Sequence, residues 1–316
     1  MSLSQHRKQP AADEIILRAP AKLNLNLRIT GKAEDGYHQL VSLVGFTAFG
    51  DSLQLRPSDQ DKITIDGPQS RALSEAGGDS LIARARDGLR DLGADIPPTA
   101  IHMTKEIPIG GGLGGGSTDA AAALRGLMQL YDIALDPQAL HHLARSLGAD
   151  VPVCLHPGWQ IMGGIGEQLY PLVQPEMPVF ITLANPGRHV ATAAIFAALN
   201  APLAGADAIA ETDRDLRAEI ASLYDQPRHA DWAGLVGLGN DLTLPASQLC
   251  PEIARLLADM ERLSSSDPAA SAPALAIAMS GSGASCFALF SEQESADALA
   301  KALQLEGYWA VASAFL

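Results

Sequence analysis

The sequence predicts an α+β protein built from two domains. The chain has 316 residues, which is enough for one large domain or two ordinary ones, each with its own core. Strand-like and helical segments follow one another without the strict alternation of a parallel α/β fold. Six glycines between residues 110 and 116 separate a predicted strand from a predicted helix. We place the boundary near residues 165–175, which gives an amino-terminal domain of residues 1–170 and a carboxyl-terminal domain of residues 171–316.

The amino-terminal half begins with strands and continues with helices. Residues 14–30 alternate apolar and polar side chains on both sides of Pro20, where we expect the strand to break. Extended, strand-like patterns predict further strands at 40–55 and 99–107. Apolar residues at helical spacing, together with helix-forming composition, predict helices at 80–92, 117–131 and 137–147. Ser117 or Thr118 is expected to cap the helix that follows the glycines, and Gly148 to end the next one.

The carboxyl-terminal half mixes short strands with helices. The patterns predict strands at 151–155, 159–162, 179–183, 274–279, 285–290 and 309–314, and helices at 192–199, 213–223 and 252–263. Two stretches rich in small and polar residues, 200–208 and 264–273, are predicted to be surface loops. No internal repeat is present, so the order of elements favours the α+β class over a repeat architecture.

The composition argues against several classes of protein. Lysine and arginine total 22 against 36 aspartates and glutamates, and the formal net charge of −14 argues against a nucleic-acid partner. Cys154, Cys250 and Cys286 lack the close spacing of a zinc or redox pair, so we expect free thiols in a reducing compartment. The polar amino terminus has no signal segment, which predicts a cytoplasmic protein. Residues 268–291 are uncharged, but the serines and glycines at 280–283 predict two short strands there and not a membrane span.

The glycine loop has the composition of an anion-binding site. Glycine costs backbone entropy, and a plain surface turn needs only one or two glycines. The N–H groups of such a loop can converge on an anion, with the positive end of the following helix behind them, and a polyphosphate is the natural ligand. A Walker loop is excluded because no lysine precedes Ser117. Gly110, Gly112 and Gly115 match the dinucleotide pattern, but helix occupies the place where that fold needs a second strand and an acidic residue.

Three motifs in the same order resemble those of the GHMP small-molecule kinases. They are the loop IPIGGGLGGGSTDAA at 107–121, PAKLNL at 20–25 and SGSGA at 280–284. The resemblance implies an amino-terminal domain like ribosomal protein S5 domain 2, a ferredoxin-like carboxyl-terminal domain, and ATP with Mg²⁺ as cofactors. It also implies small-molecule substrates, with no nucleic-acid or membrane partner, and it leaves the oligomeric state open.

One branch of this family resembles the chain more closely. The segments GKAEDGYHQL at 31–40 and LGADVPV at 147–153 are similar to the branch that phosphorylates the 2-hydroxyl of 4-diphosphocytidyl-2-C-methyl-D-erythritol in the non-mevalonate isoprenoid pathway. Two alternatives stay open: a GHMP kinase acting on homoserine or mevalonate, and a non-catalytic nucleotide-binding sensor. The sensor alternative is disfavoured because the chain keeps both Lys22 and Asp150.

The resemblance assigns two catalytic residues. By position alone, Asp150 is equally a turn or capping residue, and Lys22 is a solvated strand charge. Matched to the family, Asp150 accepts the proton of the attacking hydroxyl, and Lys22 pairs with it and holds the hydroxyl and the transferring phosphate.

The resemblance also assigns an ATP site. Its residues are Lys105, Pro108, Gly110, Gly111, Gly112, Leu113, Gly114, Gly115, Gly116, Ser117 and Thr118. Taken alone, Lys105 is equally an exposed strand charge, and Ser117 and Thr118 are equally capping residues. Ser80 stands where the family often has an asparagine beside the adenine, and no metal ligand is assigned.

The acceptor site is assigned in the same way. The family uses Tyr37 and His38 for the cytosine base, with Phe196 closing the other side, although turn decoration and a helix core explain these residues equally well. The other matched residues are Asn24, Thr192, Gly281, Ser282 and Gly283.

Overall fold

The chain folds into two units that are interleaved in sequence. A computed structural model describes residues 11–33, 36–78, 81–176, 179–199, 204–225, 230–266 and 272–316. Unit 1 comprises Met1–Pro20, Gly50–Ile109 and Gly115–His156, and unit 2 comprises Ala21–Phe49, Gly110–Gly114 and Pro157–Leu316. These units are interleaved along the chain, whereas the sequence predicts a single domain boundary near residue 170. That boundary stays a prediction.

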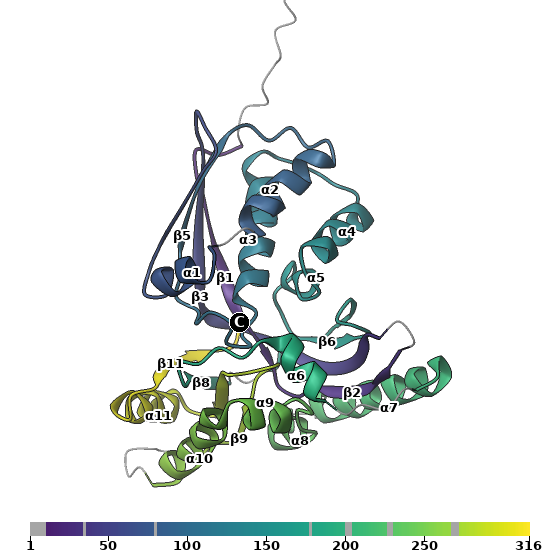
Figure 1. Ribbon diagram of the computed structural model, residues 1–316, viewed down its shortest axis with the longest axis vertical. Helices are drawn as coiled ribbons and strands as arrows, with labels where there is room; N and C mark the ends of the chain where they lie inside the picture. Colours follow the sequence, from purple (N-terminus) through teal and green to yellow (C-terminus); the bar gives the residue numbers. More distant parts are fainter. Residues whose placement is uncertain are drawn as a thin grey trace, which may run out of the picture. The chain divides into compact units, whose positions relative to one another are not determined.

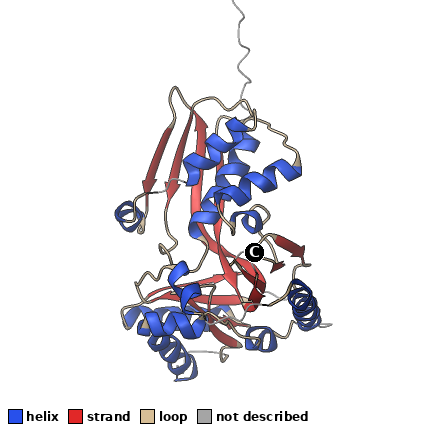
Figure 2. Ribbon diagram, turned by 45° about the vertical axis from the view of Figure 1, so that its right-hand side comes forward, coloured by secondary structure: helices blue, strands red, loops and turns tan. Residues whose placement is uncertain are grey.

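Unit 1 places most of its helices on one face of a set of strands (Figures 1 and 2). The second half of β3 (His38–Pro57) pairs with antiparallel β5 (Thr99–Thr104), and β5 pairs in parallel with β4 (Lys62–Asp66). The helices of this unit are α1 (Ser70–Glu75), α2 (Leu81–Asp91), α3 (Gly115–Leu130), α4 (Pro137–Leu147) and α5 (Val151–Cys154). Helix α3 is buried along most of its length because a run of alanines lets it lie close to its neighbours.

Unit 2 contains a four-stranded antiparallel sheet with the order β11-β8-β10-β9. Its strands are β8 (Phe180–Asn185), β9 (Ala276–Met279), β10 (Cys286–Phe290) and β11 (Trp309–Ala314). Helices fill the connections from β8 to β9 and from β10 to β11, so the chain follows the βαββαβ order of a ferredoxin-like domain. This arrangement confirms the two strands predicted around the glycines at 280–283.

The remaining elements of unit 2 complete its helices and its second group of strands. The helices are α6 (Thr192–Ala198), α7 (Ala206–Tyr224), α8 (Trp232–Gly237), α9 (Thr243–Leu249), α10 (Pro251–Ser266) and α11 (Gln293–Leu305). The strands are β2 (Arg28–Lys32), β6 (Gln160–Gly163) and β7 (Gln168–Pro171), and both β2 and β6 pair with the first half of β3. Among the described residues, no helix combines the length and the apolar character that a membrane span needs.

Two predictions that depend on prolines are wrong. Strand β1 (Ile15–Asn24) continues through Pro20, because the fixed φ of proline suits an extended strand. Neighbouring β3 approaches closely at this point, where a Cβ on Gly50 would lie 2.3 Å from the carbonyl oxygen of Ala19. Residues 151–155, predicted as a strand, instead begin with the one-turn helix α5, because the first turn of a helix tolerates Pro152.

Candidate active site

The first half of the glycine loop lies along Lys22 in unit 2. Gly110, Gly112 and Gly114 have φ values of 62°, 75° and 65°, which side chains other than glycine rarely adopt. The backbone N–H of Lys22 donates to the carbonyl oxygen of Leu113 at 2.9 Å. A Cβ on Gly114 would lie 3.1 Å from the Cβ of Lys22, whose side chain is buried. The structure thus brings the predicted lysine and this part of the loop together.

A second glycine loop, Ser280–Gly283, contacts the first loop within unit 2. The hydroxyl of Ser280 donates to the carbonyl oxygen of Gly112 at 3.1 Å, and the N–H of Ser285 donates to that of Gly111 at 2.9 Å. A Cβ on Gly112 would lie 2.5 Å from the carbonyl oxygen of Ser280, so only glycine fits there. The two segments that the sequence matched to phosphate-binding motifs are therefore in contact.

Asn24 joins the lysine strand to the second glycine loop. Its side-chain amide donates to the hydroxyl of Ser42 at 2.7 Å, and its backbone N–H donates to the hydroxyl of Ser280 at 3.2 Å. A Cβ on Gly281 would lie 3.2 Å from the amide oxygen of Asn24. The second loop is further fixed at Thr192, whose hydroxyl lies 2.9 Å from that of Ser282.

His38 and Phe196 form a pair of rings in unit 2. Their ring centroids lie 5.2 Å apart with an interplanar angle of 36°. The Nε2 atom of His38 is buried and makes no hydrogen bond to any described residue. Burial, followed by the positive charge of Lys32, lowers the pKa of His38, which favours a neutral imidazole. Tyr37 is 61% exposed, and its stacking on a base stays a prediction.

The second half of the glycine loop begins helix α3 in unit 1. The helix starts at Gly115, earlier than predicted, so Ser117 and Thr118 lie inside its first turn and the predicted cap is wrong. The hydroxyl of Thr118 donates back to the carbonyl oxygen of Gly115 at 2.9 Å. The first N–H groups of a helix have no partner within it and can bind an anion, and a phosphate site at this end of α3 stays a prediction.

Lys105 is buried beneath the start of α3. Its ammonium group lies 2.6 Å from a carboxylate oxygen of Asp51 and also forms an ion pair with Asp119. Burial lowers the pKa of Lys105, but the carboxylates of Asp119 and Asp51 outweigh that effect and raise it. A Cβ on Gly115 would lie 3.1 Å from the ammonium nitrogen. This geometry supports a role in holding the loop in place, and a direct contact with ATP stays a prediction.

Asp150 lies between α4 and α5 in unit 1. It occupies the position before the first residue of α5, and its carboxylate makes no capping hydrogen bond to that helix. Asp150 thus lies in a turn, and its role as the catalytic base stays a prediction. The predicted pairing of Asp150 with Lys22 would join the two units and stays a proposal. Pro108 lies in unit 1, two residues before the first glycine of the loop.

The described residues do not form a metal site of their own. They contain no group of three or more His, Cys, Asp or Glu side chains that could hold a metal ion. The carboxylates of Asp51 and Asp119 are engaged by Lys105, and the hydroxyl of Thr118 is engaged by its own helix. Ser80, the candidate for the adenine pocket, lies outside the described residues.

Two residues of this region were not predicted from the sequence. Asn240 donates its side-chain amide to the carbonyl oxygens of Met279 at 3.0 Å and Gly281 at 2.8 Å, which fixes the second glycine loop. In the sequence, only the Gly-Asn-Asp turn around Asn240 could have drawn attention to this residue. His189 covers Gly110, where an added Cβ would lie 1.8 Å from its Nδ1 atom. No local pattern distinguishes this histidine from a surface residue.

Comparison with known families identifies both halves of the chain. Residues 80–158 match the GHMP kinases N terminal domain, and residues 216–308 match the GHMP kinases C terminal domain. A homoserine kinase structure from Cytophaga hutchinsonii shares the fold, with a TM-score of 0.65 at 20% identity over 98% of this chain and 96% of the other. The predicted α+β class is confirmed.

Relatives that are more similar in sequence show to which branch of the GHMP kinases the chain belongs. The 4-diphosphocytidyl-2-C-methyl-D-erythritol kinase of Rhizobium johnstonii is 40% identical over 96% of this chain and 94% of its own length. The same enzyme from Paramagnetospirillum magneticum is 37% identical over 91% and 93%. A crystal structure of 4-(cytidine 5'-diphospho)-2C-methyl-D-erythritol kinase aligns with a TM-score of 0.69 and 31% identity, over 95% of this chain and 99% of the other. The chain therefore belongs to the GHMP kinases, the ATP-dependent small-molecule kinases, and within them to the 4-diphosphocytidyl-2-C-methyl-D-erythritol kinase family.

Proposed function

We propose that the protein transfers the γ-phosphate of ATP to the 2-hydroxyl of 4-diphosphocytidyl-2-C-methyl-D-erythritol, giving the 2-phosphate and ADP. The observation that supports this acceptor is the buried Nε2 atom of His38, which has no hydrogen-bond partner among the described residues. The ring of His38 lies beside that of Phe196, tilted by 36°. A buried polar atom without a partner is costly, and the edge of a cytosine base would supply that partner. Homoserine and mevalonate have no such base.

The phosphates of both substrates are proposed to bind at the two glycine loops. The first loop, Gly110–Gly116, leads into the amino-terminal end of α3, which supplies N–H donors and the positive end of the helix dipole. The second loop, Gly281–Gly283, is fixed by Asn240 and by the hydroxyl pair of Thr192 and Ser282. Backbone donors of this kind stabilise phosphate charge without adding net charge to an acidic protein.

Phosphoryl transfer is proposed to occur directly between the substrates. As the 2-hydroxyl oxygen forms its bond to the γ-phosphorus, the bond from that phosphorus to the bridging oxygen of ADP breaks, and the hydroxyl proton passes to the carboxylate of Asp150. The ammonium of Lys22 would hold the hydroxyl and the transferring group in line. The contact between Lys22 and the first glycine loop supports this role.

The remaining assignments concern the metal and the cellular location. Mg²⁺ is proposed to arrive on the phosphates of ATP, because this cation is usually held by substrate phosphates together with only one or two protein ligands. A cytoplasmic location is proposed because Cys154, Cys250 and Cys286 are free and buried, as expected in a reducing compartment.

Identification of the product tests this function. The purified protein would be incubated with Mg-ATP and the cytidyl substrate, and the products followed by phosphorus NMR and mass spectrometry. We expect one phosphate monoester at the tertiary 2-hydroxyl for each ADP released, with the diphosphate unchanged. A phosphate on another oxygen, or ATP hydrolysis without a phosphorylated acceptor, would refute the proposal.

A further inference from the structure

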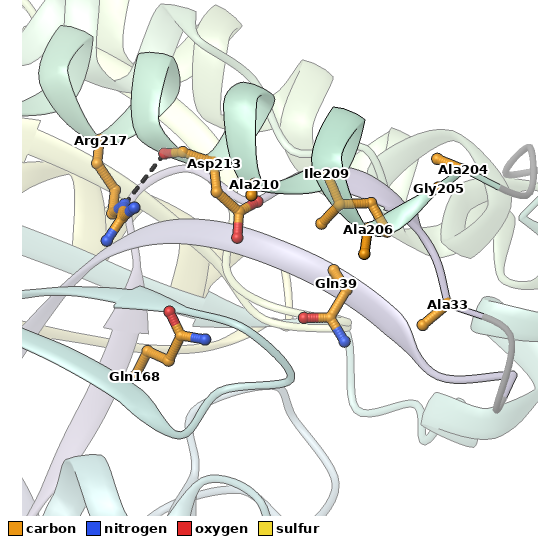
Figure 3. A pocket seen from close by; sticks show the side chains of 10 residues that line it. All are labelled: Ala33, Gln39, Gln168, Ala204, Gly205, Ala206, Ile209, Ala210, Asp213 and Arg217. Carbon is orange, nitrogen blue, oxygen red and sulfur yellow. Dashed lines mark hydrogen bonds between the residues drawn. The ribbon is translucent and has the colours of Figure 1, made fainter.

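A pocket of about 640 Å³ lies between the start of α7 and the neighbouring strands in unit 2 (Figure 3). This volume is in the range of small-molecule sites. Its apolar wall consists of Ile209 and the alanines at 33, 204, 206 and 210, and its polar groups come from Gln39, Gln168, Asp213 and Arg217. The close approach of β2 to α7 fixes one side of this region, since a Cβ on Gly31 would lie 2.8 Å from the side chain of Ile209.

Asp213 carries a buried carboxylate that faces this pocket. The residue is 6% exposed, and its Oδ1 atom makes no hydrogen bond to any described residue. Figure 3 shows the carboxylate turned toward the space that Gln39 and Gln168 also face. Burial raises the pKa of Asp213, and the charge of Glu167 adds to the rise. The nearby Thr30 hydroxyl and the charge of Arg217 oppose it, although Thr30 Oγ1 does not reach hydrogen-bond geometry.

The nearest cation is held away from this carboxylate by other contacts. The Nε atom of Arg217 donates to the backbone carbonyl oxygen of Asp213 at 3.1 Å, one helical turn earlier. Its guanidinium carbon lies 4.5 Å from the centroid of the Tyr170 ring. Arg217 therefore lowers the cost of a charge on Asp213 without forming an ion pair with it. A ligand cation could complete that pair.

The chemistry of the walls restricts the ligand further. Asp213 supplies the one carboxylate among the residues that line the pocket, and one carboxylate is too few ligands for a divalent metal. A primary ammonium offers three N–H donors, which the carboxylate of Asp213 and the amide oxygen of Gln39 can accept. The amide oxygen of Gln168 already accepts from the Tyr170 hydroxyl at 3.2 Å and has a second lone pair left. The apolar wall formed by Ile209 and the alanines suits a hydrocarbon body attached to that ammonium.

This pocket is distinct from the proposed cytosine site. Successive side chains of a strand point to opposite faces. His38 pairs with Phe196, whereas the next residue of β3, Gln39, lines the pocket. Both sites therefore share the start of β3 but use its two faces.

We propose that this pocket is a second binding site, which takes a small organic ammonium compound with its cation on Asp213 and its apolar body against Ile209 and the alanine wall. Nothing in the phosphoryl transfer requires this site, so binding there and kinase activity are independent measurements.

Calorimetric titration of the full chain with cyclohexylmethylamine tests the proposal. Cyclohexylmethanol and cyclohexanecarboxylate are the matched neutral and anionic probes. We expect saturable binding of the amine, at least tenfold weaker binding of the alcohol, and no binding of the carboxylate. Equal binding of amine and alcohol, or no binding of the amine, would overturn the proposal.

Three variants locate the bound amine. Asp213→Asn removes the charge and should weaken amine binding at least tenfold, whereas Asp215→Asn, at an exposed site on the same helix, should leave it unchanged. Ala210→Leu keeps the carboxylate but fills the pocket, and it should also abolish binding. Wild-type kinase turnover in all three variants would report an intact fold. Undiminished amine binding in either Asp213→Asn or Ala210→Leu would contradict the site.

Discussion

The buried Nε2 atom of His38 makes no hydrogen bond to any described residue, and we propose that it distinguishes the cytidyl acceptor from other alcohols. Replacing His38 with Phe keeps a ring beside Phe196 but removes Nε2. The lost hydrogen bond is worth about 1–3 kcal/mol, so the KM for the cytidyl substrate should rise roughly 5- to 150-fold. The KM for ATP should stay within about twofold of wild type. Steady-state kinetics with each substrate varied in turn would measure both, and an unchanged KM for the cytidyl substrate would remove His38 from the acceptor site.

The same histidine makes stability depend on pH. Its pKa is lowered in the folded protein by burial and by Lys32, so the unfolded chain binds a proton first as the pH falls. The contribution of a neutral His38 is fully present above the unfolded pKa of about 6.5 and is lost as the pH falls toward the folded value. Urea unfolding at pH 7.5 and 5.5 should show a larger loss of unfolding free energy for the wild type than for His38→Phe. An equal loss in both proteins would contradict the lowered pKa.

The sequence allowed the candidate site residues to be chosen, but it did not reveal the contacts that surround them. The motifs pointed to Lys22, Asn24 and the glycines, and the structure places these residues in contact. They did not reveal that Lys105 is surrounded by two carboxylates, because Asp51 and Asp119 are distant in sequence. They also gave no sign that Asn240 fixes the second glycine loop, since a Gly-Asn-Asp turn is common.

At the scale of elements, Lys105 joins three parts of unit 1. It follows β5, while Asp51 belongs to β3 and Asp119 to α3. Lys105→Met would leave two buried carboxylates without their cation, and breaking a buried ion pair in this way costs about 3–5 kcal/mol. Urea unfolding should show that loss, whereas Lys62→Met, at an exposed position on β4, should change stability by less than about 0.5 kcal/mol. A loss below about 1 kcal/mol for Lys105→Met would mean that the buried pairs do not hold these elements together.

The contact between the two glycine loops has its own test. Gly112 and Gly78 have nearly the same φ, 75° and 77°, but only Gly112 has backbone atoms in the space of a Cβ. Gly78→Ala should cost only the unfavourable left-handed backbone, about 1–2 kcal/mol. Gly112→Ala must also displace the carbonyl oxygen of Ser280, so it should cost more and raise the KM for the substrates. Equal losses of unfolding free energy in the two variants, with wild-type kinetics, would show that the loops need no close contact.

Most long elements were predictable, and several short ones were not. Helical spacing predicted α2, α3, α4 and α10 to within a few residues, although α7 begins seven residues before its predicted start and the 13-residue α11 was not predicted. Among the short elements, α6, β6 and β9 were predicted. Few residues carry the period in the others, and the patterns did not predict α1, α5, α8, α9, β4 and β7. The predictions at Pro20 and Pro152 were wrong because proline does not always interrupt an element. It also fits an extended strand, as at Pro20, and the first turn of a helix, as at Pro152.

At the scale of the whole molecule, the sequence predicted the fold class, and its single domain boundary near residue 170 stays a prediction. The mixture of strands and helices predicted α+β, and the βαββαβ order of unit 2 bears this out. Residues 21–49 belong to unit 2 although they precede the core of unit 1, which no local period reveals. The motif residues accordingly fall in both units, with Lys22 in one and Asp150 in the other.

The central claim is that this chain is a kinase for the cytidyl alcohol and uses Asp150 as its base. The most direct measurement is ADP release by the purified protein with Mg-ATP and, in turn, 4-diphosphocytidyl-2-C-methyl-D-erythritol, homoserine and mevalonate, for the wild type and for Asp150→Asn. We expect turnover with the cytidyl substrate only, and a kcat reduced about 10²- to 10⁴-fold in the variant with nearly unchanged ATP affinity. Turnover with homoserine or mevalonate, or wild-type turnover in Asp150→Asn, would contradict the account.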